Sequence, residues 1–115
     1  MKSTLTTLAV LCALAWGGTR AWRAYINVSP LTRAGWCMES GDYEGAIDFL
    51  DRARAEDPAD PRVSVQLAEC HDRLGDKAGA ARLYKSVRSV LSDPDAPPSM
   101  EYHRDRLATL ESLGY

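Results

Sequence analysis

A repeat with a period of 34 residues is the sequence feature that most limits what this chain can fold into. When residues 31–57 are compared with the residues 34 positions later, six identities appear, whereas chance at average composition gives about two. The identical pairs are Ala34 with Ala68, Gly41 with Gly75, Asp42 with Asp76, Gly45 with Gly79, Ala46 with Ala80 and Arg54 with Arg88. Such a period indicates an array in which each unit packs on its neighbour.

Helix start and stop signals recur with the same period. Ser29-Pro30 and Asp60-Pro61 are typical of an N-cap followed by proline in the first turn. Asp42 and Asp76 each follow a glycine, which predicts the end of one helix and the N-cap of the next. No segment alternates with a period of two, so we expect no strands and an all-α fold. The signals predict helices over about 30–40, 43–56, 61–74 and 77–91.

A last helix is predicted beyond a proline-rich linker at residues 93–98. We expect Ser99 to cap it, and the helix to run from Met100 to about Leu113, before Gly114. Residues 99–115 then form a C-terminal capping helix, whose apolar stripe covers the open end of the array. The stripe consists of Leu107, Leu110 and Leu113.

The residues from Pro30 to Leu91 resemble the tetratricopeptide repeat (TPR) family. The segment from Gly41 to Ile47 is similar to the family's turn between two helices, and Asp57-Pro58 closes a repeat as family repeats commonly close. Small residues stand where the two helices of a repeat approach closely. The sequence departs from the family pattern at Pro30 and Ser64, where the family often has tryptophan. The small residues are Ala34, Ala46, Ala68 and Ala80.

The resemblance implies a short α-solenoid of two helix-turn-helix repeats, at about residues 27–60 and 61–92. In such a fold the first helix of each repeat lines a concave surface that recognises a partner protein. Gly35 and Glu69 stand at two places where family members that clamp a terminal carboxylate have Lys, Arg or Asn, so we expect no such clamp. By helical phase, the partner-binding surface should expose Leu31, Met38, Glu39, Arg62, Val65, Glu69 and Arg73.

Residues 1–26 differ from the rest of the chain. Residues 3–19 contain no charged side chain, and the length of this run matches the ~17 apolar residues of the shortest spanning helices. We therefore expect an N-terminal transmembrane helix, with residues 3–19 in the lipid bilayer. Aromatic and arginine side chains that follow are typical of a membrane–water interface. They are Trp16, Arg20, Trp22, Arg23 and Tyr25.

A cleaved secretory signal is the alternative for residues 1–26. Lys2, the apolar run from Leu5 to Cys12, and a small-x-small motif at residues 13–15 match that pattern. An uncleaved anchor predicts a single-pass protein of a bacterial inner membrane. Its orientation stays open, because the arginines favour a cytoplasmic body while the signal-like shape favours periplasmic export.

No residue pattern indicates catalysis or a cofactor. The net charge is −2, with 11 basic and 16 acidic residues from Asn27 onward, so we expect no nucleic-acid partner. Cys70 and His71 are adjacent, and on a helix their side chains diverge by ~100°, which is unsuited to one metal ion. Cys37 and Cys70 fall at core-like positions and are read as small buried hydrophobes. We expect neither an enzyme nor a metal or cofactor site.

Binding is the remaining function. The sequence predicts a membrane-anchored TPR protein that mediates protein–protein interaction as an accessory or assembly subunit of a membrane protein complex. Its partners would be other, membrane-embedded subunits, together with the lipid bilayer. The alternative is an exported soluble adaptor that binds client peptides after signal cleavage.

Overall fold

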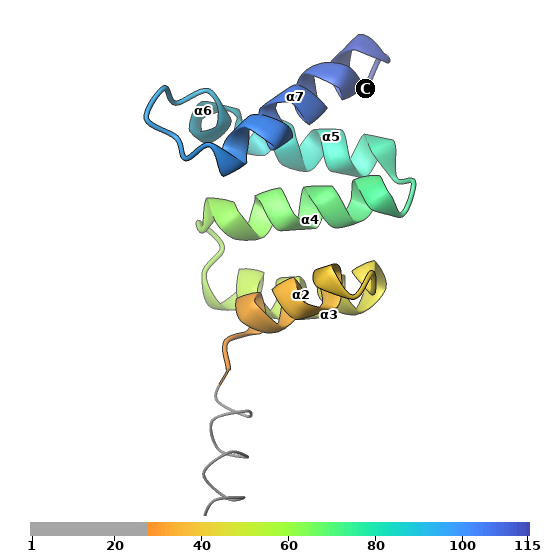
Figure 1. Cartoon of the computed structure of the whole chain (residues 1–115), viewed down its shortest axis with the longest axis vertical. Coiled ribbons are helices and arrows are strands. Elements are labelled where there is room, and N and C mark those ends of the chain that lie inside the picture. Colours follow the sequence, from red (N-terminus) through yellow and green to blue (C-terminus); the bar gives the residue numbers. More distant parts are fainter. Residues whose placement is uncertain (1–27) are drawn as a thin grey trace, which may run out of the picture.

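A computed structural model describes residues 28–115 of the chain, and within that range every regular element is a helix. Two helix pairs stack one above the other, and the last long helix lies across the end of the stack (Figure 1). This confirms the all-α prediction and the stacked pairs of a TPR-like solenoid. The helices are α2 (Pro30–Glu39), α3 (Tyr43–Glu56), α4 (Pro61–Arg73), α5 (Lys77–Ser86), α6 (Arg88–Leu91) and α7 (Ser99–Ser112).

The predicted caps form the starts of helices α2 to α5. The Ser29 side chain accepts a hydrogen bond from Thr32 N at 3.3 Å, and Asp60 accepts one from Arg62 N at 3.0 Å. Asp42 accepts from Gly45 N and Asp76 accepts from Gly79 N, each at 3.0 Å. Each cap satisfies a backbone N–H that the helix itself leaves without a partner.

Glycine is required at the turn that ends the first helix of each pair. Gly41 has φ +82° and Gly75 has φ +90°, a left-handed conformation that side chains with a Cβ rarely adopt. The turn reverses the chain, so that α3 packs on α2 and α5 packs on α4.

We expect Gly75→Ala to lower the free energy of unfolding by about 1–2 kcal/mol, because alanine is strained at positive φ. Gly35→Ala is the matched control. Gly35 lies inside α2, and a Cβ there would meet no atom within 4 Å, so alanine should stabilise the fold by roughly 0.5–1 kcal/mol. Urea unfolding followed by circular dichroism measures both, and equal effects of the two variants would contradict the turn assignment.

Helix α4 is the centre of the core. Its residues Val63, Leu67 and Cys70 pack in one cluster with the α2–α3 pair. Its residues Val65 and Ala68 pack in a second cluster with α5, α6 and α7. Ala34, Ala46, Ala68 and Ala80 are fully buried where paired helices meet, as the repeat predicted. Because α4 contributes to both clusters, the two repeats form one continuous stack.

The prediction of one helix over 77–91 is wrong, because this segment forms two helices. Helix α5 ends at Ser86, and Val87 has a non-helical backbone with φ −117° and ψ 21°. The hydroxyl of Ser86 donates to the carbonyl oxygen of Leu83 at 2.5 Å, an acceptor close to the break. Serine competes with the backbone in this way, and the chain changes direction at the following residue.

Two details of the last helix also differ from prediction. Ser99 is not its N-cap, because Pro98 already has helical dihedrals and the first turn closes between Pro98 O and Glu101 N at 3.1 Å. Leu107 and Leu110 are buried as predicted, but Leu113 is 65% exposed. Leu113 is the C-cap residue at the end of α7, and the chain turns away at the next residue, Gly114, which has φ +95°.

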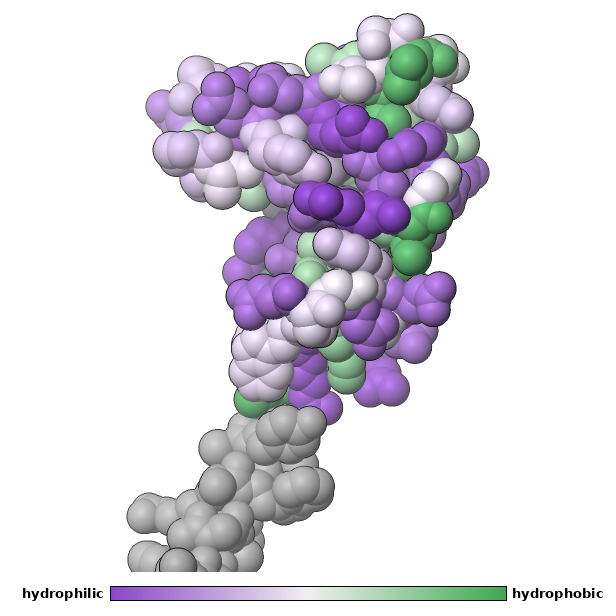
Figure 2. All heavy atoms as spheres, turned by 45° about the vertical axis from the view of Figure 1, so that its right-hand side comes forward, coloured by the Kyte–Doolittle hydropathy of each residue, from purple (hydrophilic) through white to green (hydrophobic). Residues whose placement is uncertain are grey.

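The predicted N-terminal membrane segment lies outside the described residues, as do Trp16, Arg20, Trp22, Arg23 and Tyr25. Within residues 28–115, none of the helices combines the length and apolar character needed to cross a membrane. On the face drawn in Figure 2, hydrophilic side chains predominate, and hydrophobic ones form small separate groups.

Candidate partner-binding groove

A groove of about 380 Å³ lies between the first helices of the stack and the last helix. Helices α2, α4 and α7 each contribute to its wall, so residues far apart in sequence meet there. We call this site the concave groove. It is lined by Gly35, Met38, Arg62, Val65, Gln66, Glu69, Ser99, Met100 and His103.

Four of the seven predicted partner-binding residues line the concave groove. They are Met38, Arg62, Val65 and Glu69. The expectation that Val65 is exposed is wrong, since its side chain is only 2% exposed and belongs to the core. Val65 therefore forms the floor of the groove rather than its rim.

The other three predicted residues are not among those that line the groove. Leu31 packs against the first core cluster and lines a separate hollow at the start of α2. Glu39 is exposed at the end of α2. Arg73 is also exposed, and its Nη2 atom lies 3.9 Å from Oε1 of Glu69.

Sequence reasoning missed the contribution of α7 to the groove. Ser99, Met100 and His103 line it, although the last helix was predicted only to cap the stack. Met100 and His103 are three positions apart and so share a helix face, which is a signal that the sequence does contain. What the sequence does not give is the direction of α7 across α5.

The groove is close to neutral except at Glu69. Arg62 is neutralised by Asp60, since its Nη2 atom lies 2.8 Å from Oδ2. The side chain of Glu69 is 22% exposed, and its nearest cation is Arg73 at the rim. Beside it, Oε1 of Gln66 is buried and has no hydrogen-bond partner within residues 28–115. A buried amide oxygen of this kind accepts an N–H donor when one is offered.

His103 joins the groove to the core. Its Nδ1 atom lies 3.0 Å from the hydroxyl oxygen of Tyr84, and its ring packs edge-on against Tyr102 at 5.2 Å between centroids. Burial lowers the pKa of His103, while the negative charge of Glu69 opposes that shift. Burial also raises the pKa of Tyr84. The pair is therefore uncharged in the folded protein at neutral pH.

We expect stability to fall as the pH drops from 7 through the ordinary histidine pKa of 6.5 and below it, because His103 takes up a proton in the unfolded chain at a higher pH than in the folded one. Its contribution is complete above the unfolded pKa and is lost as the pH drops through the folded value. Urea unfolding across that range measures the slope. His103→Asn removes the titration and should flatten the slope, and an unchanged slope would assign it to other groups.

The cysteine and histidine positions fit packing rather than chemistry. Cys70 is fully buried, and burial raises the pKa of its thiol to about 11, so the reactive thiolate is not populated at neutral pH. Nδ1 of His71 lies 3.0 Å from Oδ2 of Asp76, the cap of α5. Within residues 28–115, no three His, Cys, Asp or Glu side chains are grouped as metal ligands are.

Stacked helix pairs with a groove along their first helices define a helical-repeat protein of the kind that binds other proteins. A family model described as tetratricopeptide repeat matches residues 38–96, just over half of the chain. The chain belongs to the tetratricopeptide repeat family, and its repeats form a protein–protein interaction module. Neither a curated protein nor a solved structure matches it.

Proposed function

We propose that the chain is a membrane-anchored TPR protein that holds a segment of a partner subunit in its concave groove, as an accessory or assembly subunit of a membrane protein complex. The groove residues of α2, α4 and α7 carry this proposal. The uncharged run at residues 3–19 supports the anchor. An anchor raises the effective concentration of the module beside membrane partners, which suits a groove of modest size.

The groove lining indicates the chemistry of the segment. Met38, Met100 and the floor residue Val65 offer apolar contact, and methionine adapts to varied shapes. Glu69 attracts a basic side chain, and the polar side chain of Gln66 lines the groove beside it. We propose that the groove takes an extended segment with an apolar side chain next to lysine or arginine.

Selection from a random peptide library displayed on phage tests this chemistry. The full-length chain should enrich peptides that pair an apolar residue with a basic one. Glu69→Gln should weaken the binding of the selected peptides by about five- to tenfold, because the ion pair between the partly exposed Glu69 and the basic residue of the peptide is lost. Glu39→Gln is the matched control on an exposed site outside the groove. Enrichment of acidic peptides, or equal loss in both variants, would contradict the proposal.

The anchor is tested separately by intact mass and membrane fractionation. An anchored protein keeps residues 1–26 and resists extraction by alkaline carbonate. A mature chain that starts near residue 16 would replace the anchor with the exported soluble adaptor, which binds client peptides through the same groove. Pull-down from gently solubilised membranes then identifies the partner subunit.

A further inference from the structure

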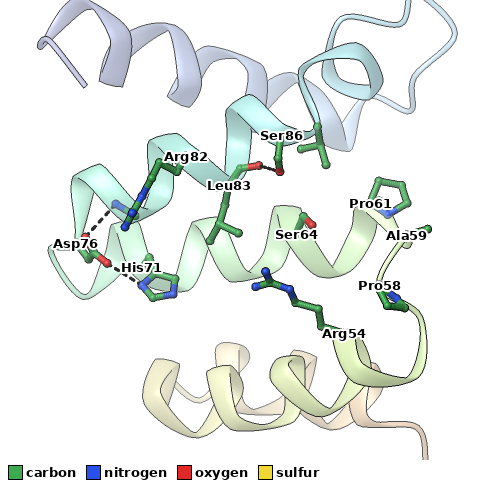
Figure 3. A pocket seen from close by; sticks show the side chains of 12 residues that line it. Arg54, Pro58, Ala59, Pro61, Ser64, His71, Asp76, Arg82, Leu83 and Ser86 are labelled. Atoms are coloured by element: carbon green, nitrogen blue, oxygen red, sulfur yellow. Dashed lines mark hydrogen bonds and ion pairs between the residues drawn. The ribbon is translucent and has the colours of Figure 1, made fainter.

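A second hollow of about 650 Å³ lies on the side of the stack formed by the second helices, α3 and α5 (Figure 3). We call it the convex pocket. Arg54 reaches into it from α3, Ser64 and His71 from α4, and Arg82 and Leu83 from α5. Pro58, Ala59 and Pro61 form its wall at the turn between the repeats. None of these residues belongs to the concave groove.

Most of the charges in the convex pocket are already paired. Asp76 accepts from Gly79 N at 3.0 Å, and this hydrogen bond is the main reason why its pKa is lowered. His71 lies 3.0 Å from the same carboxylate, and Arg82 is directed toward it (Figure 3). Arg54 differs, because within residues 28–115 no carboxylate forms an ion pair with it.

The repeat itself contains a precedent for what an arginine at this position binds. Arg88 stands 34 residues after Arg54 and is its equivalent in the sequence repeat, although it lies on α6, after the break at Val87, whereas Arg54 lies on α3. Arg88 pairs through its Nη2 atom with the carboxylate of Glu111, on the next long helix of the stack. The position 34 residues before Glu111 is occupied by Lys77, so the first repeat lacks the acidic counterpart.

We propose that the convex pocket binds an acidic side chain of a partner protein, with the Arg54 guanidinium in the role that Arg88 plays toward Glu111. Guanidinium groups suit carboxylates because their N–H donors match the two oxygens. Leu83, Val87 and the proline wall offer apolar contact to the segment that carries the acid. Residues 1–27 contain no Asp or Glu, so the chain's own N-terminal segment does not supply this group.

Two-dimensional NMR of the full-length chain tests the pocket, with acetylated hexaglutamate as the probe and hexaglutamine as the uncharged comparison. Hexaglutamate should shift the Nε–H signal of Arg54 and the backbone signals of Ser64 and Leu83. Arg54→Gln should weaken its binding by about tenfold. Arg52→Gln is the matched control, since Arg52 lies on the same helix but its guanidinium lies over the Phe49 ring, 5.4 Å from the centroid.

Three outcomes would overturn the proposal. Equal loss in the Arg52→Gln and Arg54→Gln variants would indicate diffuse attraction. Acetate that shifts the same signals at the same concentration of carboxylate would indicate a site for a free small anion. Sedimentation that shows an Arg54-dependent dimer without any peptide would assign the pocket to a second copy of the chain. Glu69→Gln changes the concave groove and leaves the convex pocket intact. Binding of hexaglutamate to the convex pocket can therefore be tested independently of the concave groove.

Discussion

Leu110→Ala should lower the free energy of unfolding by about 3 kcal/mol. Leu110 is fully buried and lies in the second core cluster with Val65, Tyr84 and Leu91. Alanine removes the transfer energy of the side chain and leaves a cavity that the closely packed helices fill only in part. Urea unfolding of the full-length chain in mild detergent, followed by circular dichroism, measures the change.

Leu113→Ala is the sharpest control for that measurement. Leu110 and Leu113 stand in the same predicted stripe, but Leu113 is 65% exposed. We expect Leu113→Ala to change stability by less than about 0.5 kcal/mol. If the two variants lost the same stability, α7 would not cross the stack in the orientation described.

Asp72→Ala should lower the free energy of unfolding by about 2–3 kcal/mol, which is the second large effect that we expect. Asp72 is only 6% exposed and joins the two helices of the second repeat, α4 and α5, to the last helix. Its carboxylate accepts hydrogen bonds from Nε and Nη2 of Arg106 on α7, and from Nζ of Lys77 at 2.5 Å. Removing one partner of a fully enclosed pair costs roughly 3–5 kcal/mol, and the partial exposure of the two cations reduces that figure.

The Asp72 network also predicts a response to acid. The hydrogen bonds from Arg106 are the main cause of its lowered pKa. Because the folded pKa lies below the unfolded one, its contribution is complete above about pH 4 and is lost as the pH falls through the folded value. Asp48→Ala, on an exposed site of α3, is the matched control and should leave the acid response unchanged. A wild-type response that persists in Asp72→Ala would locate the titrating group elsewhere.

The local structure followed from the sequence because caps and turns act over a few residues. Ser29, Asp42, Asp60 and Asp76 cap the helices that they were predicted to start, and Gly41 and Gly75 turn the chain. The 34-residue spacing placed the small alanines between paired helices. The break after Ser86 was missed because the helical periodicity does not reveal it, nor the hydrogen bond from the Ser86 hydroxyl to Leu83 O that lies beside it.

The site was predicted less completely, because it depends on how α7 lies across the stack. Helical phase does not reveal that Arg106, which is 34 residues away, covers Asp72. The same placement brings Met100 and His103 into the groove beside Met38. Such contacts between distant segments arise from packing, so helical phase within α2 and α4 found only four of the six lining residues that those two helices contribute.

Site-specific photocrosslinking in cells tests the central proposal, that the concave groove holds a partner protein, most directly. Gly35 is the best position for a benzoylphenylalanine probe, because it lines the groove and an added Cβ meets no atom within 4 Å. The same probe at Asp48, on the exposed face of α3, is the control. We predict a discrete crosslinked partner from position 35 that Glu69→Gln diminishes. Crosslinks from position 48 with none from position 35 would contradict the proposal.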